Sequence, residues 1–401
     1  MGVACAWAVA QHGLSVAVLE RGHIGSGCSY GNAGWLTPSL ALPLAQPGTP
    51  AKAFRWLFDP ESPLYIEPRL DPALFRWLVG FLWASREKPF WKAAPALLEL
   101  SRASVQTWEE LAGRSSIPFG FERHGLVSVY ESPRAFDRGR RMAEKLAQLG
   151  IPSAIWSPDE VREREPAVVG RQVGACFFPE DAHCEPFAAV QALAEEARQR
   201  GVTFHEETEL YGVDQSNGVV ERLRTTRGAL RPRHVVLAVG ADSAVLGRLF
   251  GLKLPILGAK GYTLLVPRLR HHPKRSIYLT ERKIAINPHR HCLRLGGTLE
   301  LVQGDRSVRH RRVQAILKGA SGMLELPQPL EILELWRGLR PCSPDGLPVI
   351  GRARGYRNLW LATGHQMAGL KTAPATGELL ADLLTETAPR IDPRPFRADR
   401  Y

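Results

Sequence analysis

The sequence has no uninterrupted apolar run that approaches the ~18 residues of a membrane-spanning helix. It also has no Cys-x-x-Cys pair and no cysteine spacing typical of a zinc site, so we expect no bound metal. No signal peptide is recognisable. The six cysteines are therefore expected to be reduced thiols in a cytoplasmic protein.

No continuous run of basic residues is present, although the formal net charge is +12 and the isoelectric point is about 9.7. The basic residues are scattered and form no recognised nucleic-acid-binding module, so we expect no nucleic-acid partner. The apolar and charged contents are those of an ordinary globular enzyme. A chain of 401 residues is too long for one simple core, which predicts two domains.

The N-terminal segment resembles part of a dinucleotide-binding unit. Residues 4–12 suit a buried helix, and residues 14–19 suit a buried parallel strand that ends at Glu20. Such units place an acidic residue there to bind a ribose hydroxyl. Gly2 fits the third glycine of G-x-G-x-x-G, but the first strand and the first two glycines are absent, so we expect that the chain begins late. The alternative is a generic helix and strand with no cofactor role.

Two glycine-rich segments suit a ligand site. Residues 21–34 form a loop with small polar side chains directly after the strand that ends at Glu20. Residues 336–384 comprise a Gly/Pro-rich loop (340–351), a short strand (358–362), a turn (363–369) and an apolar helix. Backbone N–H groups at such a turn and helix start can approach an anionic oxygen or a ring edge closely. The second segment therefore predicts a site for a flat, electron-rich group.

The order of elements predicts a fold that combines α/β and α+β parts. A buried strand at 234–238 ends in a glycine turn, and residues 254–304 alternate as antiparallel strands do. We expect a discontinuous Rossmann-type domain (1–50, 183–250 and 336–401) with an inserted antiparallel-sheet substrate domain (51–182 and 251–335). Helices are expected at 71–85, 95–115 and 306–324.

Residues 54–92 are rich in aromatic side chains with Arg and Lys between them. A basic, aromatic helix suits an anionic membrane surface, and it suits equally a helix packed on its own domain. The first interpretation places the protein as a peripheral protein on the inner face of the cell membrane.

Several motifs together resemble one family, the FAD-dependent D-amino-acid oxidase superfamily. They are the start up to Glu20, GSGCSYGNAG (25–34), DAHCEPF (181–187), HVVLAVGADS (234–243), GLRPCSPDGLPVIG (338–351) and LWLATGHQMAGLKTAPATG (359–377). Within that superfamily the chain is most similar to the bacterial D-amino-acid dehydrogenases (small subunit) and to glycine oxidase-like enzymes. The resemblance covers essentially the whole chain, and the incomplete glycine fingerprint is the main departure from it.

The resemblance implies noncovalent FAD. The implied cofactor-binding residues are Gly2, Glu20, Arg21, Ser26, Cys28, Ser29, Asn32, Ala33, Leu210, Gly240, Ala241, Gly364, His365, Ala368, Gly369 and Leu370. Arg340 is the expected anchor for a substrate carboxylate, with a structural pairing to Asp345 as the alternative. Tyr262 is expected to line the pocket over the flavin, and His365 is counted among the catalytic residues.

The family resemblance implies oxidative deamination of D-amino acids to 2-oxo acids and ammonia. A hydride passes to flavin N5, and the electrons go on to a quinone or another acceptor. One alternative is the oxidation of a secondary or cyclic amine, such as D-hydroxyproline, glycine or sarcosine. The other is a truncated, non-catalytic remnant that does not bind FAD.

Overall fold

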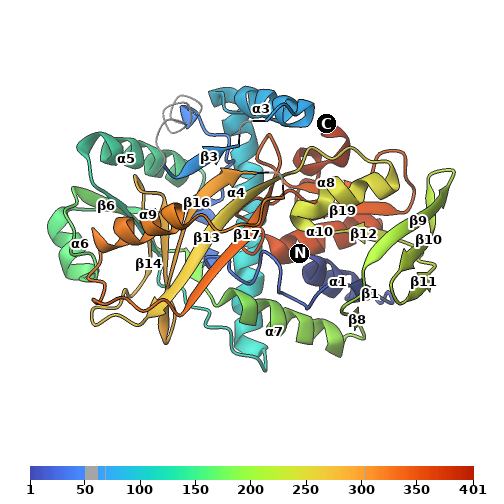
Figure 1. The fold of residues 1–401 in the computed structure, drawn as a ribbon, viewed down its shortest axis with the longest axis horizontal. Helices are drawn as coiled ribbons and strands as arrows, with labels where there is room; N and C mark the ends of the chain where they lie inside the picture. The colour runs from blue at the N-terminus through green and yellow to red at the C-terminus, as the bar shows by residue number, and fades with distance from the viewer. Residues whose placement is uncertain (50–61, 68, 303) are drawn as a thin grey trace.

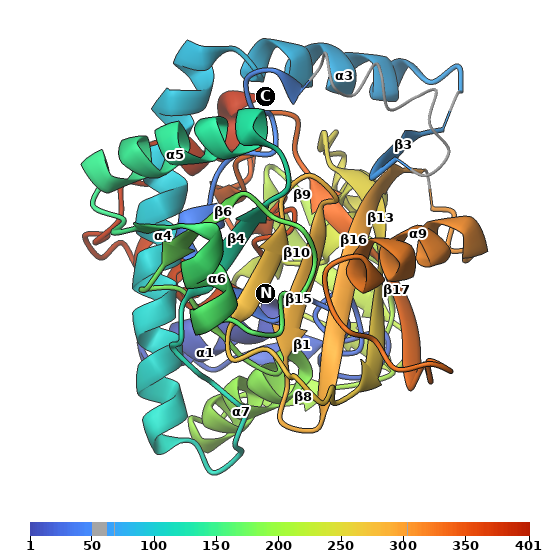
Figure 2. The same ribbon diagram turned by 90° about the vertical axis from the view of Figure 1, so that its left-hand side faces the viewer.

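The computed structural model describes residues 1–49, 62–67, 69–302 and 304–401. The described chain forms two halves side by side (Figure 1). One half holds the helices α1 (Gly2–Ala10) and α10 (Ala373–Leu384), and the other holds a long sheet. The helix α4 (Glu87–Arg114) crosses behind the boundary between them (Figures 1 and 2). This mixed α/β architecture confirms the predicted fold class, while the exact domain boundaries stay a prediction.

The parallel strands of the first half lie in two separate groups. They are β1 (Ala17–Leu19) with β8 (Thr203–His205), and β12 (Val235–Leu237) with β19 (Leu359–Thr363) and the antiparallel β18 (Val349–Arg352). Consecutive residues of β1 and of β12 line one cavity. The edge strand of each group therefore faces that cavity. The side chains of β1 are therefore partly exposed, whereas the sequence predicted a longer, buried strand.

The helix α1 packs tightly because its side chains are small. All its residues from Val3 to Ala10 are buried, and it lies against α10 and α7 (Pro186–Gln199). A Cβ added at Gly377 of α10 would lie 2.3 Å from the carbonyl oxygen of Ala4. The two helix backbones are therefore in direct contact, which fixes the start of α1 relative to the C-terminal segment.

The second half is built on a nine-stranded sheet. Its strands, in spatial order, are β17 (Glu334–Cys342), β13 (Leu257–Pro267), β16 (Cys292–Leu301), β15 (Ile284–Pro288), β14 (Ser276–Leu279), β4 (Leu126–Tyr130), β6 (Gly174–Phe178) and β5 (Ala154–Trp156), with β3 (Leu64–Ile66) beside β16. Pairing is antiparallel except for β14 with β4 and β3 with β16. The antiparallel sheet predicted for residues 254–304 is thus the middle of a larger one.

Helices cover this sheet and its ends (Figure 2). They are α3 (Pro72–Ala84), α5 (Pro133–Gln148), α6 (Pro158–Arg164) and α9 (His310–Ser321), while the short α8 (Ser243–Leu246) belongs to the first half. A further hairpin sheet comprises β9 (Leu210–Ser216), β10 (Val219–Thr225) and β11 (Gly228–Leu230), and β2 (Trp35–Leu36) pairs with β7 (Ala182–His183). Within the described ranges, no helix combines the length and apolarity needed to cross a bilayer.

Two local predictions were wrong. The helix expected to begin at Pro95 begins at Glu87 and carries Pro95 inside it. The segment 340–351, expected as a loop, contains the end of β17 and the start of β18. In both places long-range packing overrides the local proline and glycine signals.

The contact between α1 and α10 generates a stability prediction. Gly377→Ala forces the two backbones apart and should lower the free energy of unfolding by about 1–3 kcal/mol, as overpacked cores do. Gly113→Ala is the matched control, because Gly113 is exposed in α4 and its Cβ would meet no atom within 4 Å. That control should be neutral or stabilise by up to about 1 kcal/mol. Equal denaturation midpoints for both variants would contradict the close approach.

Candidate active site

A cavity of about 2360 Å³ lies between the two halves. Ligand pockets are usually about 300–1,000 Å³, so this space has room for an extended cofactor and a substrate. Most of the predicted site residues line it, namely Gly2, Glu20, Arg21, Ser26, Cys28, Ser29, Asn32, Ala33, Leu210, Gly240, Ala241, Arg340, His365, Gly369 and Leu370. Gly364, Ala368 and Tyr262 do not.

One end of the cavity is formed where β1 ends. The Glu20 carboxylate accepts a hydrogen bond from the backbone N–H of Gly22 at 2.8 Å, which holds it at the cavity wall. Arg21 forms an ion pair with Asp242 at 3.1 Å, and this pair joins the loop after β1 to the turn after β12. An acidic residue after β1 and a glycine turn after β12 therefore lie together at this end of the cavity, as in a nucleotide site.

The glycine-rich loop after β1 lies along the cavity. Asn32 accepts a hydrogen bond from Gly34 N–H at 2.8 Å, and the Cys28 thiol donates to the carbonyl of Leu339. Cys28 is open to the cavity rather than to bulk solvent, and burial raises the pKa of its thiol. A Cβ added at Gly31 would lie 2.0 Å from the indole of Trp336. The loop backbone is thus pressed against strand β17.

The C-terminal turn is bound to the end of β17. The N–H of Gln366 donates to the carbonyl of Pro341 at 2.9 Å, and His365 forms an isolated bridge with Cys342. Burial lowers the pKa of His365 to about 3, and its Nε2 lies 3.1 Å from the Thr376 hydroxyl. The imidazole is therefore neutral at physiological pH and places no positive charge beside the cavity.

Arg340 has an unusual position for a cation. Its Nη1 donates to the carbonyl of Thr298 at 2.8 Å, and the described residues provide no carboxylate partner for it. Burial lowers the pKa of this guanidinium. The alternative pairing with Asp345 is excluded, because Asp345 instead binds Arg400 at 2.8 Å. The guanidinium lies over Gly261, where an added Cβ would be 2.0 Å from Nη1.

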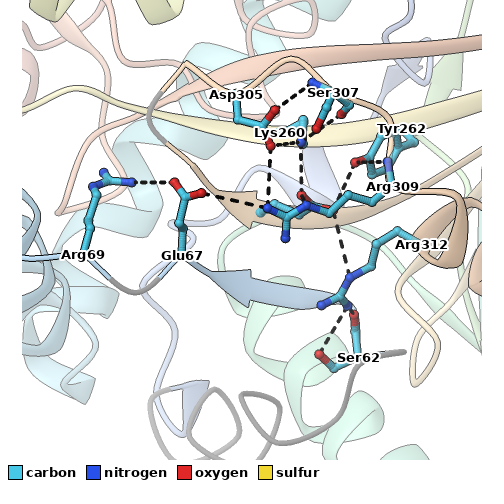
Figure 3. A network of polar contacts seen from close by, with 10 residues as sticks. Ser62, Glu67, Arg69, Lys260, Tyr262, Asp305, Ser307, Arg309 and Arg312 are labelled. Carbon is cyan, nitrogen blue, oxygen red and sulfur yellow. Dashed lines mark hydrogen bonds and ion pairs between the residues drawn. The ribbon is translucent and has the colours of Figure 1, made fainter.

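Tyr262, expected over the flavin, lies on the opposite face of β13 (Figure 3). Its hydroxyl donates to Glu300 at 3.1 Å and accepts from the backbone N–H of Arg309 at 3.2 Å. Successive side chains of a strand point to opposite faces, so the neighbouring Thr263 lines the cavity instead. The Thr263 hydroxyl donates to the carbonyl of Gly31 at 3.1 Å.

Among the residues of the cavity wall that sequence reasoning missed are Trp336, Thr298 and Lys371. Lys371 Nζ donates to the Thr37 hydroxyl at 2.8 Å, and burial lowers the pKa of its ammonium group. Adjacent glycines within a strand mark a close approach by other groups. The pair Gly296–Gly297 before Thr298 was therefore the signal for that residue, whereas nothing local marks Lys371.

The cavity suits FAD. No side chain caps the start of α1, so the N–H groups of its first turn remain available to an anion. A Cβ added at Gly27 or Gly240 would meet no atom within 4 Å, so a ligand can approach the backbone directly there. Glu20 supplies the acidic group at the ribose end, and all these residues line one continuous space.

Comparison with known proteins agrees with this geometry. The family of FAD-dependent oxidoreductases named DAO matches residues 1–383. A D-amino acid dehydrogenase of Chromohalobacter salexigens is 30% identical over all of this chain and 97% of its own. The structure of glycine oxidase from Geobacillus kaustophilus superposes with a TM-score of 0.80 at 26% identity, covering 100% of this chain and 96% of that one.

A third comparison shows the fold alone. The structure of L-proline dehydrogenase from P. horikoshii has a TM-score of 0.77 at 20% identity, covering 99% of this chain and 94% of that one. Together with the cavity, the family match and the full-length relative establish the class of the chain. The chain belongs to the DAO family and is an FAD-dependent amino-acid oxidoreductase.

Proposed function

We propose that the chain oxidatively deaminates D-amino acids to 2-oxo acids and ammonia. The observation that carries this proposal is Arg340, a partly buried guanidinium that lines the cavity without a carboxylate partner among the described residues. A planar, permanently charged fork binds a carboxylate through two parallel hydrogen bonds. The D configuration is supported by the similarity to D-amino acid dehydrogenases.

In this proposal FAD is held without a covalent bond. Glu20 and Arg21 hold the adenosine ribose, with Leu210 beside the adenine. Three segments lie along the pyrophosphate. They are Gly2 at the start of α1, the glycine-rich loop with Ser26, Cys28, Ser29, Asn32 and Ala33, and the turn with Gly240 and Ala241. His365, Gly369 and Leu370 of the C-terminal turn surround the flavin's pyrimidine edge, while Gly364 and Ala368 do not line the cavity and only shape the turn. When bound, FAD supplies at N5 an acceptor for the hydride of the substrate α-carbon.

The other roles follow from the charges of the chain's own residues. Arg340 fixes the carboxylate and thereby orients the α-carbon. His365 is neutral, so it does not compete with Arg340 for the substrate anion. No general base is required once the substrate amine has lost its proton to solvent. The imino acid that leaves the cavity then hydrolyses in water.

A second candidate substrate class is a secondary or cyclic amine with a carboxylate, such as glycine, sarcosine or D-hydroxyproline. The structural similarity to a glycine oxidase favours it. The Arg340 anchor serves both classes equally, so only the group on the α-carbon and nitrogen distinguishes them.

Replacing the anchor tests the proposal. Arg340→Met should raise KM for the preferred D-amino acid by roughly 100-fold or more, because charge-assisted hydrogen bonds of about 1.5–3 kcal/mol are lost. The measurement is anaerobic bleaching of the flavin absorbance with a panel of D-, L- and cyclic amino acids. Arg352→Met is the control, since Arg352 is exposed on β18. Bleaching by L-amino acids alone, or an unchanged KM in Arg340→Met, would refute the proposal.

We further propose a quinone or similar membrane acceptor, reached through peripheral contact of α3. Phe75, Val79, Leu82 and Trp83 of this helix are 68%, 49%, 53% and 59% exposed. Arg86 lies 4.8 Å over the Trp83 ring, so a cation accompanies the apolar face. The helix lies at one end of the molecule in both views (Figures 1 and 2). Residues 54–61 and 68 of the predicted membrane segment lie outside the described residues.

Flotation with vesicles that contain anionic lipid tests this contact. Phe75→Ser with Trp83→Ser should reduce the bound fraction at least about tenfold, because each buried aromatic ring contributes ~1.5–3 kcal/mol. Ile155→Ser with Val169→Ser is the matched control, as these residues are 44% and 58% exposed elsewhere. Equal flotation of the wild type and both variants, or none in the wild type, would contradict the proposed surface.

A further inference from the structure

Strand β16 is irregular where it faces Arg340. Lys260 pairs with Glu300 and Tyr262 with Gly297, so one residue of β13 lies opposite two residues of β16. Thr298 is one of those two, and its φ is +62°. A β-branched residue rarely adopts this left-handed conformation, which suits glycine far better. The bulge therefore holds a threonine where backbone geometry alone favours glycine.

The two polar oxygen atoms of Thr298 differ in their hydrogen bonding. Its carbonyl oxygen accepts from Arg340 Nη1 at 2.8 Å. Its hydroxyl is buried and has no hydrogen-bond partner among the described residues, although the residue lines the cavity. A buried hydroxyl without a partner is unfavourable and needs an explanation. Thr298 therefore has both a strained backbone conformation and an unpaired hydroxyl.

The surroundings keep this corner open. Gly296 and Gly297 precede Thr298 and line the cavity without side chains, and Gly261 leaves room for the guanidinium. Nη1 is occupied by the Thr298 carbonyl, while the structure gives the other guanidinium N–H groups no partner among the described residues. An anion bound by those groups would lie at the part of the cavity wall that Thr298 also lines.

We propose that Thr298 is a specificity-determining residue whose hydroxyl donates a hydrogen bond to the substrate carboxylate beside Arg340. The inference rests on the proposed function and deepens it: the enzyme selects substrates with a free α-carboxylate over amino-acid amides and simple amines. In this proposal the bulge lets a single residue make two contacts: the Thr298 carbonyl accepts from Arg340, and the Thr298 hydroxyl donates to the bound anion.

Three variants of Thr298 in the FAD-loaded enzyme separate this role from a structural one. Thr298→Val removes the hydroxyl at constant shape, Thr298→Ser retains it, and Thr298→Gly removes it while relieving the left-handed backbone. The readouts are the Kd of benzoate as a carboxylate probe, from the flavin absorbance change, the KM and kcat of the best substrate, and the Tm.

The valine and glycine variants should bind benzoate on the order of tenfold or more weakly, as expected for a lost hydrogen bond to a charged group. KM should rise with little change in kcat. Thr298→Ser should stay within about threefold of the wild type, and Thr298→Gly should have an unchanged or higher Tm. Weaker binding in a glycine variant that is not destabilised is the result that a merely structural threonine cannot produce.

Two outcomes overturn the inference in distinguishable ways. If Thr298→Val and Thr298→Gly bind benzoate like the wild type while Arg340→Met does not, the role of Thr298 is refuted and the proposed function stands. If Arg340→Met also binds benzoate normally, the anchor itself is misplaced and the proposed function fails with it.

Discussion

The structure depends on how it accommodates one partly buried cation. Arg340 is desolvated at the cavity wall, and the described residues offer it a carbonyl rather than a carboxylate. Taking a charge out of water is costly unless an opposite charge accompanies it. Gly261 has no side chain where the guanidinium lies, and the bulge at Thr298 supplies the carbonyl that fixes it. These features hold an unneutralised cation ready for an anionic ligand.

The strand that carries this cation is also joined to the other half of the molecule. Strand β17 carries Arg340 and ends against the C-terminal turn, where Gln366 N–H binds the Pro341 carbonyl. That turn continues from β19 of the other half into α10, and α10 packs on α1 through Gly377. The turn proposed to bind the cofactor and the proposed substrate anchor Arg340 are therefore connected by short contacts. Such preorganisation is what placing an α-carbon against a cofactor requires.

Local sequence patterns predicted the elements with clear boundaries. The strand β19, the helix α10 and the acidic residue Glu20 follow from apolar runs bracketed by glycine turns. The face of β13 was not predictable in this way. Both faces of that strand are buried, so its sequence shows no alternation to tell Tyr262 from Thr263. The bulge at Thr298 depends on the pairing of β13 with β16, which no local pattern encodes.

A second cation, on the opposite face of β13, shows why it matters that Arg340 has no carboxylate partner among the described residues. Lys260 lies there, fully buried, with Asp305 at 2.7 Å and Glu300 at 3.4 Å. Figure 3 shows this cation in contact with the Asp305 carboxylate and the Ser307 carbonyl. The sheet therefore neutralises a buried cation where the cation only supports the fold. On the cavity face it leaves Arg340 without a carboxylate partner among the described residues, and we propose that a bound substrate completes the pair.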